Sequence, residues 1–155
     1  MKKTIKIIKH IISGGQSGVD RSALDFSIQY NLPYSGYCPK NRWAEDGKIA
    51  PEYKLTETKE SEPEFRTLQN IIHSDGSLVI YNIIDKGIQT TIRLAQQYSK
   101  PFFILKLNQE INIIEFRNWL KENKINRLNV AGPRESNDPG IYLKTFEILK
   151  QLLLE

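Results

Sequence analysis

The chain has 155 residues, of which 39% are hydrophobic and 26% are charged, values typical of a globular protein and not of a disordered one. Its net charge is only +4, which is compatible with an anionic small-molecule ligand but weak for a nucleic-acid-binding module. The single cysteine, Cys38, excludes an intrachain disulfide, and no apolar run is long enough for a transmembrane helix. We therefore expect one domain over residues 1–155 in a reducing, cytoplasmic location, with no nucleic-acid or membrane partner.

Short apolar runs alternate with helical stretches along the whole chain. The first run carries Lys6, Lys9 and His10 and is followed by no cleavage-site pattern, so it predicts a strand and not a signal peptide. Alternation of this kind predicts an α/β fold in which helices cover both faces of a parallel sheet. The predicted strands are 5–12, 34–38, 77–82, 101–107 and 127–131; the predicted helices are 19–31, 62–72, 87–99, 111–123 and 139–154; and residues 39–60 are expected to be irregular.

Ligands of an open parallel sheet bind beyond the carboxyl ends of its strands. This rule selects the loops at 13–18, 38–48, 82–88 and 131–138. We expect these four loops to lie along one edge of the sheet and to form the binding site.

The first of these loops, GGQSG, leads directly into a helix. Its backbone N–H groups and the helix dipole can hold an anion, but a tight packing turn explains the glycines equally well. The order G-G-x-x-G fits neither the dinucleotide fingerprint nor the Walker loop. The acidic residue that follows complements the helix dipole, and the arginine after it either points to solvent or binds an anion held by the loop. The candidates here are Gly14, Gly15, Gln16, Ser17, Gly18, Asp20 and Arg21.

The second loop, CPKNRWAEDG, interleaves cations, an aromatic ring and carboxylates. Lys40 and Arg42 can hold a phosphate, and Trp43 can stack on a flat heterocycle. Glu45 or Asp46 can accept two N–H bonds from the amino-pyrimidine edge that pterins and guanine share. The alternative is a solvated loop with the tryptophan packed on the core.

The loop after the fifth strand reads AGPRESNDPG. Gly132 allows a close approach, and Arg134 and Ser136 can reach the same crevice as the first loop. Asp138 and Pro139 are expected to be the N-cap and first-turn residues of the last helix. We expect a common positive crevice with contributions from Arg21, Lys40, Arg42 and Arg134.

The stretches GGQSGVDRSALD, CPKNRWAEDG, HSDGSLVIYN and LNVAGPRES together resemble the molybdenum carrier proteins, relatives of the molybdenum-cofactor carrier of algae. These proteins fall within the broader Rossmann-like group that includes the LOG proteins, once called lysine decarboxylases. The resemblance covers nearly the whole chain in order. It implies a Rossmann-like three-layer sandwich with five parallel strands near the order 3-2-1-4-5, self-association, and a negatively charged pterin-type cofactor that carries molybdate. The positions that match the family's motifs are Gly14, Gly15, Gly18, Asp20, Arg21, Lys40, Arg42, Glu45, Asp46, Ser74, Asp75, Gly76, Gly132, Arg134, Glu135 and Ser136.

One departure from the wider group bears on catalysis. LOG-type phosphoribohydrolases carry P-G-G-x-G-T-x-x-E, whereas the corresponding stretch here keeps only Gly87 and has no glutamate between Asp85 and Ser99. The carboxylate that hydrolysis requires is therefore missing at this place, which argues against an enzyme. Thr90 and Thr91 remain as donors to an anion.

We therefore expect a non-catalytic, homo-oligomeric carrier of a phosphorylated heterocycle: the molybdenum cofactor (molybdopterin) or a nucleotide-like relative. Molybdoenzymes are the expected recipients. The chain's two histidines and one cysteine suggest neither a thiol nucleophile nor a zinc site. The first alternative is a nucleoside 5'-monophosphate N-glycoside hydrolase that uses Glu45, Asp46 or Asp75, and the second is a nucleic-acid-binding module.

Overall fold

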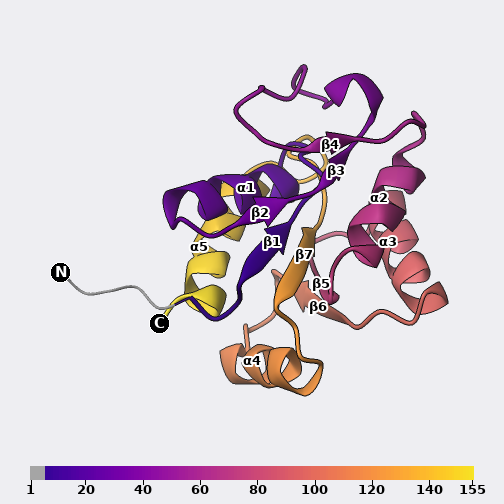
Figure 1. The fold of residues 1–155 in the computed structure, drawn as a ribbon. Coiled ribbons are helices and arrows are strands. Elements are labelled where there is room, and N and C mark those ends of the chain that lie inside the picture. Colours follow the sequence, from indigo (N-terminus) through magenta and orange to yellow (C-terminus); the bar gives the residue numbers. More distant parts are fainter. Residues whose placement is uncertain (1–5) are drawn as a thin grey trace.

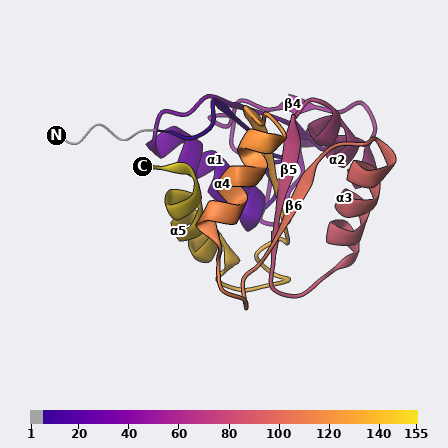
Figure 2. The ribbon, with the colours of Figure 1, turned by 90° about the horizontal axis from the view of Figure 1, so that it is seen from below.

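The computed structural model describes residues 6–155 and has the expected α/β architecture (Figure 1). Five parallel strands form one sheet, in the order β2-β1-β7-β5-β6. Figure 2 shows the three layers, with α1, α4 and α5 on one side of the sheet and α2 and α3 on the other. The strands are β1 (His10–Ile12), β2 (Tyr34–Ser35), β3 (Tyr37–Cys38), β4 (Thr56–Glu57), β5 (Gly76–Tyr81), β6 (Phe102–Lys106) and β7 (Arg127–Ala131), and the helices are α1 (Val19–Gln29), α2 (Pro63–Ile72), α3 (Lys86–Gln97), α4 (Ile113–Glu122), α5 (Ile141–Leu153) and a short 3-10 helix, η1 (Lys40–Arg42).

The predicted strand order was wrong. Counted along the chain, the strands of the main sheet lie in the order 2-1-5-3-4, because β7 inserts between β1 and β5. The order would be the predicted 3-2-1-4-5 if β7 and α5 preceded β1 in the sequence. The two ends of the described chain are neighbours: Lys6 forms an antiparallel bridge with Leu154, and Ile7 N donates to Leu153 O at 2.9 Å. Chain ends placed in this way are compatible with a permuted connection.

The predicted second strand, 34–38, is divided in two. A Cβ on Gly36 would overlap the carbonyl oxygen of Ser13, so a glycine is required where the chain crosses the end of β1. Beyond this crossing, β3 leaves the main sheet and pairs in parallel with β4. The segment 39–60, expected to be irregular, therefore contains a strand and the helix η1.

The last helix begins later than predicted. Asp138 does not cap it: its Oδ2 is buried and has no hydrogen-bond partner among the described residues. The N-cap is Gly140, with φ of 92°, and the carboxylate of Glu135 accepts from Gly140 N and Tyr142 N, both at 3.0 Å. A carboxylate at this position satisfies helix N–H groups and complements the dipole, so Glu135 takes the capping role.

The apolar core is larger on one face of the sheet than on the other. Its larger part lies between the sheet and the layer of α1, α4 and α5, where Phe26, Phe116 and Leu149 are fully buried. On the other face, a smaller cluster of Val79, Tyr81 and Ile88 packs β5 against α3. Among the described residues, no helix is long and apolar enough to cross a membrane.

Candidate functional site

The four predicted loops meet at one edge of the sheet, as expected. Glu45 accepts hydrogen bonds from Ser17 Oγ at 2.7 Å and Ser136 Oγ at 2.6 Å, which joins the first, second and fourth loops. Asn137 Nδ2 donates to Asp85 Oδ2 at 3.1 Å and joins the third loop to the fourth. The carboxyl-end rule therefore predicted correctly that these four loops come together.

A cavity of about 380 Å³ lies at this edge, between α2, α3 and the carboxyl ends of the central strands. We call it the interhelix pocket. Its volume is within the usual range for small-molecule sites. Seven predicted site residues line it: Gly14, Asp20, Gly87, Thr90, Thr91, Gly132 and Arg134. Six polar residues that the sequence did not single out line it as well: Glu64, Arg66, Thr67, Asn70, Lys86 and Asn129.

A buried ion pair lies in the wall of this pocket. Asp20 is only 6% exposed, and its Oδ2 accepts from Arg66 Nη1 at 3.2 Å and from Gln16 N at 3.4 Å. No described residue donates to the other oxygen, Oδ1, and Arg66 Nε is buried without a partner. Burial raises the pKa of the Asp20 carboxyl, and the charge of Arg66 opposes that rise. The pair thus keeps hydrogen-bonding capacity that the protein itself does not use.

Gly14 is required by this ion pair. A Cβ at this position would overlap the Nη1 atom of Arg66 and lie 3.0 Å from Asp20 Oδ2. The first glycine of the loop therefore leaves room for the guanidinium group.

Two cations stand at the pocket beside the start of α3. Lys86 is the first residue of α3 and forms no ion pair within residues 6–155. The side chain of Arg134 is 36% exposed, and its Nε lies 3.7 Å from Glu45 Oε2. Thr91, predicted to donate to an anion, instead donates its hydroxyl to Gly87 O at 3.0 Å. The positive charge available to a ligand therefore comes chiefly from the lysine and the arginine.

The glycine loop is a packing turn in this structure. Three of its N–H groups already donate to side-chain oxygens of the chain: Gly15 N to Ser13 Oγ, Gln16 N to Asp20 Oδ2, and Ser17 N to Gln16 Oε1. Gly15 and Gly18 have positive φ angles of 80° and 79°. A Cβ on Gly18 would also overlap the backbone at residues 133–135.

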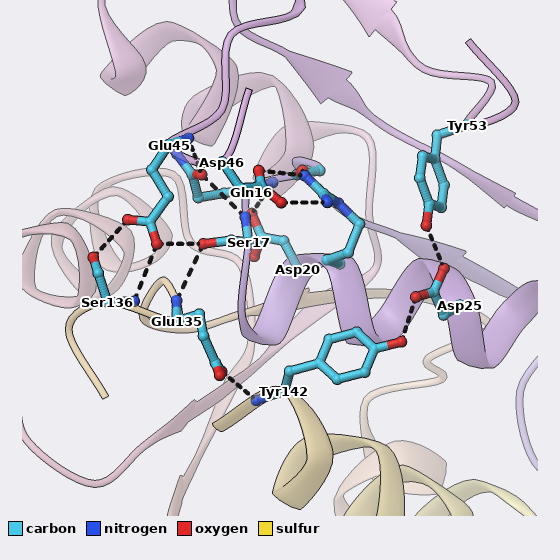
Figure 3. A network of polar contacts seen from close by, with 12 residues as sticks. Gln16, Ser17, Asp20, Asp25, Glu45, Asp46, Tyr53, Glu135, Ser136 and Tyr142 are labelled. Carbon is cyan, nitrogen blue, oxygen red and sulfur yellow. Dashed lines mark hydrogen bonds and ion pairs between the residues drawn. The ribbon is translucent and has the colours of Figure 1, made fainter. Parts of the chain in front are cut away.

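A second polar cluster lies beside the pocket, at the start of α1 (Figure 3). We call Ser17, Arg21, Glu45, Asp46 and Ser136 the loop clasp. Besides the two serine hydroxyls, Glu45 accepts from Ser136 N at 3.0 Å. Arg21 donates to both oxygens of Asp46, at 2.9 and 3.2 Å, and to Gly15 O. These groups, predicted from the sequence to bind a ligand, hold three loops together and also line a second, open cavity of about 720 Å³.

The pKa values of the clasp carboxyls agree with this role. Burial alone would raise the pKa of Glu45, but the hydrogen bonds from Ser136 and Ser17 outweigh it, and the pKa lies below its ordinary value. The hydrogen bond from Arg21 lowers the pKa of Asp46. Both groups are stabilised in their ionised form by the protein itself.

Residues 11–153 match the Circularly permutated YpsA SLOG family. The chain belongs to this family. The permutation in the family's description agrees with the position of β7, the last strand of the chain, at the centre of the sheet. A crystal structure named "Putative molybdenum carrier protein", from Syntrophus aciditrophicus, is 40% identical to this chain, with a TM-score of 0.90. The similarity covers 95% of this chain and 96% of that one, and it confirms the family resemblance read from the four motifs. Among curated proteins, none matches this SLOG-family chain.

The expected common positive crevice was wrong. Of the four cations, only Arg134 lines the interhelix pocket, because Arg21 is held in the loop clasp. Arg42 donates to three backbone carbonyls, those of Ile49 at 3.0 Å, Ala50 at 2.7 Å and Tyr53 at 2.8 Å. Lys40 is exposed and does not line the pocket.

Trp43 does not pack on the core, since it is 51% exposed. The guanidinium carbon of Arg134 lies 5.7 Å from the centre of its ring. The tryptophan therefore stands near the pocket through a cation–π contact, although it does not line the pocket.

Ser74 and Asp75 are not brought to this edge. They immediately precede β5, at its amino end, where Asp75 Oδ2 accepts from Asn126 N at 3.0 Å and Arg127 N at 2.8 Å. Ser74 Oγ donates to Ile71 O at 2.8 Å at the end of α2. Both residues fix the opposite end of the sheet and lie outside the pocket.

Some of the pocket residues that were not predicted carry a recognisable signal in the sequence, and others carry none. Asn129 is a buried amide between the buried apolar residues Leu128 and Val130, which is a usable signal of a polar function. Lys86 falls within the predicted loop 82–88. Arg66 is an ordinary helical arginine without a motif, so only the packing of α2 against the sheet edge identifies it.

Proposed function

We propose that this SLOG-family protein binds a small phosphorylated heterocycle in the interhelix pocket, and that the ligand is a molybdenum-cofactor-type pterin or a nucleotide-like relative. The observation that carries the proposal is the Asp20–Arg66 pair in the wall of a 380 Å³ pocket, with hydrogen-bonding capacity left over. Buried polar groups are normally hydrogen-bonded, so a pocket-lining carboxylate oxygen that the protein does not use is available to a ligand. The name of the similar Syntrophus aciditrophicus protein supports the choice of ligand.

The pocket offers different chemistry to the two parts of such a ligand. Lys86 and Arg134 stand near the N-terminus of α3, where cations and the helix dipole favour an anionic group. Val79 and Ala131 add apolar surface for a ring. We therefore assign the phosphate to the side of α3 and the heterocycle to the side of Asp20.

A second candidate function is hydrolysis of an N-glycosidic bond in a nucleoside monophosphate. The carboxylates first considered for this reaction, Glu45, Asp46 and Asp75, do not line the pocket. Asp20 does, and its raised pKa is a property shared by many catalytic carboxyls. This observation keeps the hydrolase as the alternative, although α3 lacks the glutamate of LOG-type enzymes.

Calorimetric titration of the purified protein with a pterin phosphate and with GMP tests the proposal, combined with chromatography of the recovered ligand. We expect saturable binding and an unchanged ligand. Arg134→Ala should weaken binding by about 1.5–3 kcal/mol, because it removes a charge-assisted hydrogen bond. The control is Lys121→Ala, which removes an exposed cation of α4 that forms no ion pair with the described residues and does not line the pocket.

Two results would contradict the carrier function. The first is an absence of saturable binding. The second is release of the free base, dependent on Asp20, which would establish the hydrolase instead. Unchanged affinity in a correctly folded Arg134→Ala variant would show that Arg134 does not bind the ligand.

A further inference from the structure

The carboxylates around this edge of the sheet differ in what their oxygens contact. Five of them are saturated by the chain, with each of their two oxygens accepting at least one hydrogen bond. Glu135 accepts from the start of α5, and Asp85 from Ile88 N and Asn137 Nδ2. The five are Asp25, Glu45, Asp46, Asp85 and Glu135.

Asp20 differs from these five because no described residue donates to its Oδ1; Glu64 also keeps an oxygen without a donor but is exposed, and the buried Oδ2 of Asp138 does not line the pocket. Gln16 N and Arg66 Nη1 both bind Oδ2, which fixes the orientation of the carboxylate. Oδ1 keeps its lone pairs, and the residue lines the pocket while its side chain is only 9% exposed. A nearly buried acceptor of this kind requires a hydrogen-bond donor from whatever fills the pocket.

We propose that Asp20 is a specificity-determining residue that accepts hydrogen bonds from the N–H edge of a 2-amino-4-oxo pyrimidine ring, the edge that pterins and guanine share. The inference rests on the proposed function, because it assigns one side of the same pocket to the ring. A carboxylate repels phosphate, so the phosphate must lie away from Asp20, toward Lys86 and Arg134. The ring offers its N–H groups as donors, and the hydroxyls of a ribose are donors too, but those hydroxyls are identical in GMP and XMP, so a comparison of these two ligands isolates the ring edge.

An isosteric substitution inverts this recognition. In Asp20→Asn, the amide oxygen must face Gln16 N and Arg66, because both are donors. The amide NH2 then faces the pocket and offers donors where the wild-type protein offers an acceptor. A 2,4-dioxo ring, as in xanthine, presents an oxygen at the position of the amino group and should now be favoured.

Titration of the wild-type and variant proteins with GMP and XMP tests the inference. We expect the wild-type protein to bind GMP about 10- to 100-fold more tightly than XMP, since mispairing a charged acceptor has a large cost. Asp20→Asn should reverse this preference. Asp25→Asn is the matched control: it makes the same change in the same helix, outside the pocket, and should keep the preference for GMP.

Equal binding of GMP and XMP by the wild-type protein would overturn the inference and leave the proposed function in place. An Asp20→Asn variant that unfolds thermally like the wild-type protein and still prefers GMP would overturn the inference as well. An absence of saturable binding of GMP, XMP and a pterin phosphate would overturn the proposed function and the inference together. If Asp20→Asn does not fold, the comparison of GMP with XMP on the wild-type protein still decides the question.

Discussion

The interhelix pocket and the loop clasp are neighbours at one edge of the sheet, and both are built from charged side chains. In the clasp, both oxygens of Glu45 and both oxygens of Asp46 accept hydrogen bonds from the chain. In the pocket, one oxygen of Asp20 and one nitrogen of Arg66 have no partner among the described residues. The contrast teaches that charge alone does not indicate a ligand site: the chain already occupies the carboxylate oxygens of the clasp, whereas Asp20 lines a pocket with one oxygen still available.

The largest loss of stability is expected at Gly18, where the first loop packs against the backbone of the fourth loop. Gly18→Ala should lower the free energy of unfolding by about 3 kcal/mol, because the Cβ overlaps the backbone at 133–135 at a residue with positive φ. Gly47→Ala is the control, since Gly47 also has a positive φ but has open space around it. That control should cost only about 1 kcal/mol. Urea unfolding measures both variants. Equal losses of unfolding free energy in Gly18→Ala and Gly47→Ala would show that the positive φ, and not the overlap with residues 133–135, determines the loss.

The next prediction tests whether Arg42 has a structural role or binds the ligand. Arg42→Ala should destabilise the protein by about 2 kcal/mol, because three backbone carbonyls lose their donor. Affinity for a pterin phosphate should not change. Lys48→Ala, at an exposed residue of the same segment, should alter neither quantity. A loss of affinity with unchanged stability in Arg42→Ala would return this arginine to the binding site.

The clasp should also weaken in acid. The pKa of Glu45 lies below its ordinary value of 4.5 in the folded protein, so its stabilising contribution is complete above 4.5 and is lost as the pH falls through the lowered pKa. Glu45→Gln should therefore be less stable than the wild-type protein at neutral pH, by about 1 kcal/mol. The gap between the two proteins should close in acid. A gap that stays constant across urea unfolding at several pH values would contradict the assignment.

The smallest effect concerns Asp25, which lies beyond the clasp on α1 and accepts from the hydroxyls of Tyr53 and Tyr142 (Figure 3). Burial and the nearby Asp25 carboxylate raise the pKa of Tyr53 from 10.0 to about 12. This raised pKa stabilises the fold below pH 10, and the contribution disappears as the pH rises toward 12. Tyr53→Phe should cost about 0.5–1 kcal/mol at neutral pH and show a weaker alkaline decline.

Tyr98→Phe is the control for this substitution, because Tyr98 is 44% exposed and forms no side-chain hydrogen bond with the described residues. Ultraviolet titration of the tyrosines measures the pKa directly. A Tyr53 hydroxyl that ionises near 10.0 would contradict the predicted dependence.

The sequence located the elements and the edge that carries the loops, because alternating apolar runs and the carboxyl-end rule are local or topological signals. The strand order could not be obtained in this way, since adjacency along the chain places β7 at an edge and not between β1 and β5. The hydrogen-bond and ion-pair partners of the charged side chains could not be predicted from the sequence either. Arg21 and Asp46 are 25 residues apart, and Glu45 and Ser136 are 91 apart, so only the fold decides that they neutralise or satisfy one another.

The position of β7 has a consequence for how the chain folds during its synthesis. The pairs β2–β1 and β5–β6 consist of segments that leave the ribosome earlier, but each has an unpaired edge where β7 belongs. Residues 127–131 supply the strand that joins them, and they are made when most of the chain already exists. The nascent protein therefore exposes two open strand edges until residues 127–131 have been made, and edges of this kind favour pairing with other chains. The protein depends on β7 both to complete its sheet and to cover these two edges.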